Sequence, residues 1–225
     1  MKTIMFLALV VGIPLLAQQT DSTIVFESPN KNLASVPKTI SLNAWGVDIL
    51  LSNNGFGLAG FYRREYSREL SGTITLGIAD SKDDNEVELV DYYTGQSIVI
   101  GKINRFLVFP LMFGVQYRLF AEDIADNFRP YINAGIGPTL VLAAPYEREW
   151  FSSWSYARSY YSGGGFIGLG AYFGNDMGSL NGINIRYYFI PYKNGIISLQ
   201  APSGQIGRKT DFGGFFITLN LGSMF

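Results

Sequence analysis

Alternation of apolar and polar residues with a period of two recurs along this chain, and it constrains the fold more than any other feature. Near the end of the sequence one parity is apolar, as Phe215, Ile217 and Leu221 show. The other parity is mostly small or polar, as Thr218 and Asn220 show. A period of two is typical of a β-strand whose two faces meet different surroundings.

The same pattern recurs often enough to predict eight strands, most of them about ten residues long, which is enough to cross a bilayer when tilted. An even number lets the first and last strands pair antiparallel and leaves no open edge. The predicted strands cover Lys38–Leu50, Gly55–Tyr66, Leu70–Ala79, Arg105–Phe120, Arg129–Leu142, Gly163–Phe173, Gly182–Tyr192 and Gly213–Phe225.

The connections between these strands alternate in length. Three of the four odd connections are long and all even ones are short, as in outer-membrane barrels, which have longer outer loops and short periplasmic turns. The odd connections are Leu51–Asn54, Ser81–Asn104, Ala143–Ser162 and Lys193–Phe212. The even ones are Ser67–Glu69, Ala121–Phe128 and Gly174–Asn181.

These observations predict an all-β fold, an eight-stranded antiparallel up-and-down transmembrane β-barrel with its apolar stripes facing lipid. Within the second long connection, residues 87–90 and 97–100 predict a hairpin above the membrane. The facing of Asp48 is open, because Leu42 shares its parity whereas Trp45 and Val47 do not.

The beginning of the chain predicts export. Residues 1–17 combine Lys2 with an apolar core and end at Ala17, which is typical of a signal peptide. Residues 18–37 form a polar N-terminal extension, and residues 38–225 form the barrel domain. We expect the protein in the bacterial outer membrane with both termini on the periplasmic side.

Polar residues within the predicted strands indicate what the barrel encloses. A charge on the lipid face costs about 2–4 kcal/mol near the midplane, so we expect these side chains inside. Glycines of the same parity predict a crowded interior: Gly135, Gly137, Gly168 and Gly170. The predicted lumen residues are Arg63, Glu65, Gln116, Arg118, Asn133, Arg186 and Asn220.

One long connection is rich in aromatic residues. Trp150, Trp154, Tyr160 and Tyr161 are candidates for the aromatic girdle at the lipid–water interface. For residues 150–154, a surface contact patch remains an equally open reading.

Composition excludes several functions. With no Cys and no His, the sequence offers no thiolate or imidazole metal site and no nucleophile activated by His. A net charge of −1 gives no basic face for nucleic acid. The acidic residues 80–88 indicate a solvated loop, since Lys82 occupies a ligand position of an EF-hand loop. We therefore expect no catalytic residues, no cofactor and no metal.

Together, the signal peptide, the eight amphipathic strands and the terminal Phe225 resemble the small outer-membrane β-barrel proteins of the OmpA/OmpX type. The resemblance implies that the last strand, ending in Phe225, is read by the barrel-assembly machinery. Ser223 departs from the apolar residue usual at its parity. The partners implied are outer-membrane lipid and that machinery, with any extracellular ligand unknown.

The function expected on these grounds is structural or surface-interacting rather than catalytic. One alternative is the passage or binding of small or hydrophobic solutes across the outer membrane. Another is a soluble exported β-barrel that carries a ligand inside.

Overall fold

A computed structural model describes residues 42–53, 55–93, 95, 97–121, 127–174, 178–201 and 203–225. The predicted signal peptide, the polar extension and the first residues of the first predicted strand lie outside these ranges. The fold below is that of the described residues.

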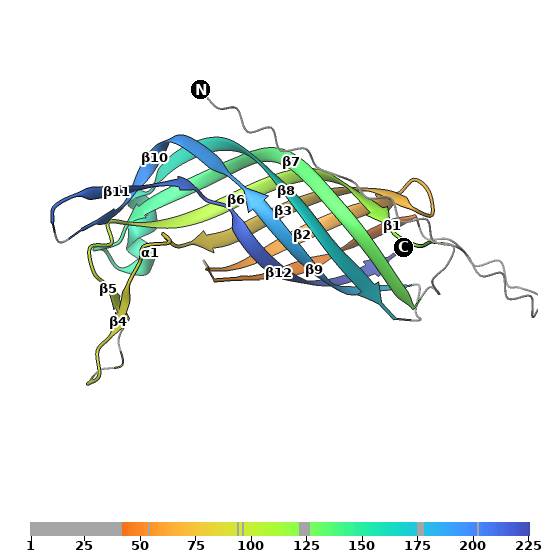
Figure 1. The fold of residues 1–225 in the computed structure, drawn as a ribbon, viewed down its shortest axis with the longest axis horizontal. Helices are drawn as coiled ribbons and strands as arrows, with labels where there is room; N and C mark the ends of the chain where they lie inside the picture. Colours follow the sequence, from red (N-terminus) through yellow and green to blue (C-terminus); the bar gives the residue numbers. More distant parts are fainter. Residues whose placement is uncertain are drawn as a thin grey trace, which may run out of the picture. The chain divides into compact units, whose positions relative to one another are not determined.

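Eight strands close into one antiparallel barrel, as the sequence predicts (Figure 1). Around the wall the order is β1-β12-β9-β8-β7-β6-β3-β2, so every strand pairs on both sides and the barrel has no open edge. Its strands are β1 (Asn43–Ser52), β2 (Gly55–Glu65), β3 (Leu70–Ser81), β6 (Asn104–Arg118), β7 (Phe128–Pro145), β8 (Arg158–Phe173), β9 (Ser179–Phe189) and β12 (Gly214–Met224).

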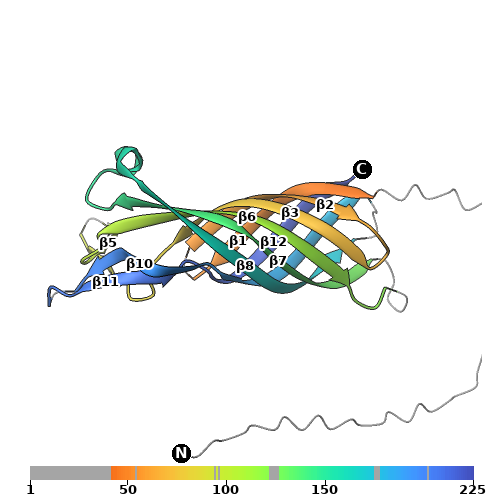
Figure 2. The ribbon, with the colours of Figure 1, turned by 90° about the horizontal axis from the view of Figure 1, so that it is seen from above.

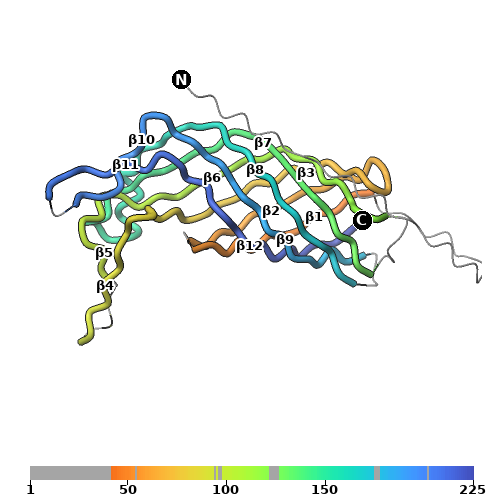
Figure 3. The backbone as a smooth tube through the Cα atoms, in the orientation of Figure 1, coloured from red at the N-terminus to blue at the C-terminus, as the bar shows by residue number. Residues whose placement is uncertain are grey.

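The seam between the first and last strands completes the barrel. Ala44 pairs with Met224 and Leu51 with Ile217. At the end of the chain, Phe225 N donates to Asn43 O at 2.8 Å. Strands β7, β8 and β9 run obliquely to the long axis (Figure 3).

Strand β8 begins earlier than expected. The sequence predicts a start at Gly163, but the strand begins at Arg158 and pairs with the equally extended end of β7, Leu140 opposite Tyr161. Residues 158–162 belong to the aromatic-rich stretch, which hides their alternation. The β7–β8 side of the wall is therefore taller than the sequence indicates.

The predicted hairpin within the second long connection is confirmed as β4 (Glu88–Val90) and β5 (Ser97–Val99). The third contains a short helix α1 (Trp150–Ser153) and a 3-10 turn η1 (Trp154–Tyr156). These elements lie at the end of the barrel opposite the C-terminus (Figures 1 and 2). We call this the loop end, and the end with the short connections and the C-terminus the turn end.

A further hairpin was not expected. Residues 193–212 were predicted to be a loop, but β10 (Pro191–Gln200) and β11 (Ile206–Asp211) form a two-stranded sheet. The hairpin also contacts the segment before β6, where Gln200 N donates to Gly101 O at 2.7 Å and Ile103 N donates to Ser198 O at 2.8 Å. This long connection is thus an ordered extension of β9 and β12.

Candidate functional site

The outer surface of the barrel is apolar around its circumference. Every barrel strand carries large hydrophobic side chains of one parity that are 40–78% exposed. They include Trp45 and Val47 of β1, Leu58 of β2, Leu76 of β3, Phe113 of β6, Ile136 of β7, Leu169 of β8, Ile185 of β9 and Ile217 of β12. The apolar stripes therefore point outward, as predicted.

Asp48 faces inward and is fully buried, which settles the open question on the first strand. Strand β1 begins at Asn43, so Leu42 precedes it and its parity does not bear on the facing of Asp48. Arg186 Nη1 donates to Asp48 Oδ2 at 2.8 Å, and Asn220 Nδ2 donates to Asp48 Oδ1. Tyr131 OH extends this network by donating to Asn220 Oδ1 at 3.2 Å.

A second group of charges lies nearer the turn end. Arg63 forms an ion pair with Glu65 at 2.7 Å. The guanidinium carbons of Arg63 and Arg129 lie 5.1 and 5.9 Å from the centre of the Tyr172 ring. The Tyr172 hydroxyl donates to Gln116 Oε1 at 3.2 Å, and its ring stacks on Tyr131 at 4.6 Å between centroids. Aromatic faces and amide groups thus hold the arginines in the interior.

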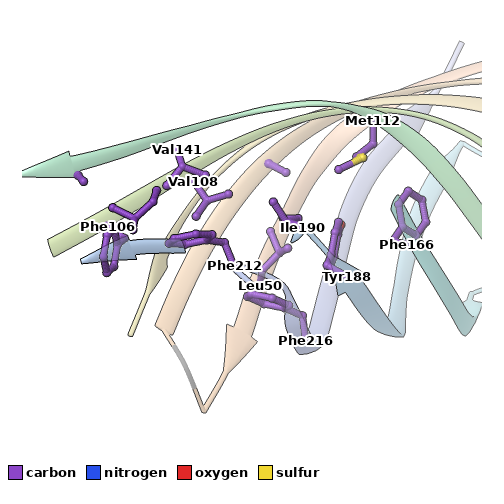
Figure 4. Packing of buried hydrophobic residues seen from close by; sticks show 13 residues of the cluster. Leu50, Phe106, Val108, Met112, Val141, Phe166, Tyr188, Ile190, Phe212 and Phe216 are labelled. Atoms are coloured by element: carbon purple, nitrogen blue, oxygen red, sulfur yellow. The ribbon is translucent and has the colours of Figure 1, made fainter. Parts of the chain in front are cut away.

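Towards the loop end the interior becomes apolar, whereas the sequence analysis predicts only polar residues and glycines for the interior. Thirteen buried residues form one hydrophobic cluster, ten of which are labelled in Figure 4. Phe106 packs edge to face on Phe212 with centroids 5.1 Å apart, and Tyr188 packs likewise on Phe216 at 5.5 Å. A narrow barrel fills its interior with side chains, and apolar ones fill it without needing hydrogen bonds.

Crowding of the interior explains the inward-facing glycines. A Cβ at Gly135 would lie 2.5 Å from Cε1 of Phe166, and one at Gly170 would lie 2.8 Å from the Tyr131 hydroxyl. A Cβ at Gly168 would lie 2.6 Å from Asn133 Oδ1. The glycines therefore leave the space that large neighbouring side chains occupy.

The structure places the seven predicted lumen residues at inward positions. Five are buried, whereas Glu65 and Arg118 are half-buried. Two groups emerge, one centred on the Asp48–Arg186 pair and one on the Arg63–Glu65 pair. The buried residues are Arg63, Gln116, Asn133, Arg186 and Asn220.

The four aromatic candidates fall into two exposed residues and two that are partly buried. Trp150 on α1 and Tyr161 on β8 are 52% and 78% exposed. Trp154 is half-buried against Trp150, with centroids 5.7 Å apart. The prediction for Tyr160 is wrong, because this side chain faces the interior. Its ring packs on that of Tyr192 with centroids 5.5 Å apart. Adjacent residues of a strand face opposite sides, so Tyr160 and Tyr161 cannot share one surface.

Sequence reasoning missed the inward aromatics and several loop charges. Tyr131 and Tyr172 were not singled out, because a buried aromatic inside a barrel has no pattern of its own. In the loops, Lys102 Nζ and Glu86 Oε2 form a largely buried ion pair at 2.7 Å. Lys209, on the unexpected hairpin, is 6% exposed.

The described residues show neither a metal-binding group nor the context of a dinucleotide site. Within the described ranges, no three His, Cys, Asp or Glu residues are grouped as a metal ion requires. No helix in the described part of the chain is long and apolar enough to cross a membrane. The G-x-G-x-x-G string at residues 163–168 lies inside β8 and precedes no helix, so it lacks the context of a dinucleotide site.

No family model matches the sequence, and no curated protein matches it. Among solved structures, Neisserial surface protein A is similar at 10% identity with a TM-score of 0.50, covering 81% of this chain and 95% of that one. The attachment invasion locus protein Ail of Yersinia pestis is 12% identical over 81% of this chain and 95% of that one, with a TM-score of 0.41. OprG of Pseudomonas aeruginosa is 11% identical over 81% of this chain and 94% of that one, with a TM-score of 0.41.

At this level of identity the likeness concerns the fold. The closed antiparallel ladder, the outward apolar stripes and the similarity to Neisserial surface protein A agree with one another. The chain has the eight-stranded barrel fold of the small outer-membrane β-barrel proteins.

Proposed function

We propose that the protein is an integral, non-catalytic protein of the bacterial outer membrane, in which a sealed barrel is the anchor and the loop end is a surface for interaction. The observation that carries this proposal is the apolar outer surface of a barrel whose backbone groups are paired within the closed ladder. Such a surface is favourable against hydrocarbon and unfavourable against water.

The same surface argues against a soluble ligand carrier. Ile136 is 75% exposed and Leu169 is 61% exposed, and neither has polar neighbours at its own parity on the strand. A soluble protein rarely exposes a contiguous apolar patch beyond a few hundred Å². Here the exposed apolar residues surround the whole barrel. Burial of this surface in lipid therefore has a lower free energy than its exposure to water.

Passage of solutes is disfavoured by what fills the interior. Along the barrel axis, the hydrophobic cluster at the loop end is followed by the buried Asp48–Arg186 pair and then by the Arg63–Glu65 pair. A solute would have to displace packed aromatic rings and then separate a buried ion pair, and each step is costly.

The proposal also assigns partners. Outer-membrane lipid contacts the apolar belt, and the barrel-assembly machinery reads the last strand with its terminal Phe225. This residue is 60% exposed and continues the outward parity of β12. The turn end, where the chain finishes, faces the periplasm in this proposal.

Fractionation of cells that express the full chain tests the membrane location. We expect the protein in the outer-membrane fraction, released by detergent and not by high salt or carbonate. Unheated protein is expected to migrate differently from boiled protein in a denaturing gel, because a closed barrel resists the detergent. Recovery from the soluble periplasm without detergent would contradict the anchor.

Planar bilayers then test the sealed interior. Purified folded protein is expected to give no discrete conductance steps, with a known porin as the positive control. Steady single-channel conductance would contradict the sealed barrel while leaving the membrane location intact.

A further inference from the structure

A pocket of about 770 Å³ lies at the loop end, between the β10–β11 hairpin and the acidic segment before β4. Asp83 and Asp84 line one side, and Gly207 and Lys209 of β11 line the other. Leu199 and Ile206 add apolar surface. Its size is within the range of small-molecule sites, and its walls combine apolar surface with a few polar groups, as such sites do.

Lys209 is the unusual member of this lining. The residue is 6% exposed, yet its ammonium group has no hydrogen bond within the residues that the structure describes and no carboxylate within 4.0 Å. Its nearest aromatic contact is the Phe212 ring, 5.9 Å from Nζ. The Asp83 carboxylate attracts Lys209, but only from beyond 4.0 Å. Burial of a cation without a hydrogen bond or a close ion pair is costly, so an anion bound next to the Lys209 ammonium group would stabilise it.

Three other charged groups nearby already have a hydrogen bond or an ion pair, namely Lys102, Arg208 and Asp83. Lys102 is paired with Glu86 at 2.7 Å, and Arg208 donates to the carbonyl of Asn194 at 3.1 Å. Asp83 Oδ1 accepts hydrogen bonds from N and Nδ2 of Asn85. Lys209 is therefore the ammonium group in this lining that is available to a ligand.

We propose that this pocket binds the anionic group, a carboxylate or a phosphate, of a small polar ligand of about the size of a sugar. Lys209 receives the anion, and the side chains of Gln200, Gln205 and Thr210 at the same lining supply hydrogen bonds to the polar body. The inference deepens the proposed function and rests on it for access to the exterior, because it gives the loop surface a class of ligand.

Gly207 offers a way to close the pocket without touching Lys209. A Cβ at this position would meet Leu199 O at 3.6 Å and Leu199 Cβ at 3.7 Å, which are ordinary contacts. Gly207→Leu is therefore tolerated by the backbone and places an apolar side chain in the pocket.

Calorimetric titration of the purified, folded full chain in detergent tests the site. The probes are glucuronate for the carboxylate, glucose 6-phosphate for the phosphate, and glucose as the neutral control. We expect at least one anionic probe to bind and glucose to bind at least tenfold more weakly. Which anion binds more tightly distinguishes the two sources of charge.

Two variants and a control complete the experiment. Lys209→Met is expected to weaken the anionic probe about tenfold or more, the loss of one charge-assisted hydrogen bond. Gly207→Leu is expected to weaken it similarly. Lys193→Met, on the same hairpin but outside the pocket, is the matched control and is expected to stay within about twofold.

Failure of the ligand site can be told apart from failure of the membrane proposal, because each variant is first checked for the gel shift of a folded barrel. Folded protein that binds neither anion, or glucose as well as the anions, would overturn the site. Binding that survives Lys209→Met undiminished would also overturn it. None of these results would bear on the outer-membrane anchor.

Discussion

The interior of the barrel is divided into two regions that are filled in opposite ways. Towards the loop end, Phe106, Phe212 and their neighbours pack as a hydrophobic cluster. Towards the turn end, the interior is held by the Asp48–Arg186 pair and by arginines that lie over Tyr172. The outer surface shows no such division, because every barrel strand carries outward apolar side chains.

This difference shows what the membrane does and does not dictate. Lipid requires an apolar exterior, but it leaves the interior free to be polar or apolar as long as it is packed and its charges are paired. The apolar region depends on shape alone. The charged region depends on specific partners, such as Asp48 for Arg186. Not every polar group there has one, since the side-chain amide of Asn184 is buried without a hydrogen bond to the described residues.

Asp48→Asn is expected to have the largest effect. It leaves the buried Arg186 without its carboxylate while keeping the size of the side chain. Removing one member of a buried ion pair costs about 3–5 kcal/mol, so we expect a loss near the middle of that range. Urea unfolding in lipid vesicles, followed by tryptophan fluorescence, measures it.

The double variant Asp48→Asn with Arg186→Met is the control for this prediction. Because both charges are gone, we expect it to be more stable than Asp48→Asn alone. If the double variant is less stable by the sum of two independent losses, the pairing is not what stabilises this region.

Phe106→Ala probes the apolar region and is expected to cost about 3 kcal/mol. The value is at the lower end for Phe→Ala, because the cavity lies near the loop end and can collapse. Phe106→Leu is the matched variant and is expected to lose less than half as much. Equal losses for the two variants would mean that packing does not govern this region.

Gly135→Val tests how tightly the interior is filled, with an expected loss of about 2 kcal/mol. Its Cβ would collide with Phe166 Cε1, and overpacking of this kind costs about 1–3 kcal/mol. Adding Phe166→Leu is expected to restore part of the loss. A Gly135→Val variant as stable as the parent would show that the interior has room to spare.

Lys82→Gln is expected to have the smallest effect. Its ion pair with Glu88 spans 4.0 Å between two exposed side chains, and such pairs contribute about 0–1 kcal/mol. The same urea titration is expected to shift by less than about 0.5 kcal/mol. A loss comparable to that of Asp48→Asn would remove the contrast between buried and exposed charges.

The outward half of the fold is predictable from the sequence because one rule, apolar side chains outward, applies to every barrel strand. The spacing of Ile183, Ile185 and Phe189 predicts their strand and its outward face without information on the neighbouring strands. The paired first and last strands follow from the even count. Arg63, Arg118 and Arg186 are placed inside by the same rule, since a charge on the lipid face is costly.

The inward half is less predictable, because its residues are chosen by local shape. Tyr160 was assigned to the interface because it lies beside Tyr161, yet its partner is Tyr192 across the interior. The β10–β11 hairpin was missed because residues 193–195 and 201–205 are polar or small and look like loop. Lys209 and its pocket depend on that hairpin, so no local pattern reveals them.

The central claim, that the apolar stripes face hydrocarbon, is best tested by single-cysteine labelling, since the chain contains no cysteine. A nitroxide is attached in turn at Phe215, Ile217 and Leu221, and then at Phe216, Thr218 and Asn220, in lipid vesicles. Accessibility to oxygen, which concentrates in lipid, is expected to be high at the first three positions and low at the second three. High oxygen accessibility at Phe216, Thr218 and Asn220 with low values at the other set would contradict the account.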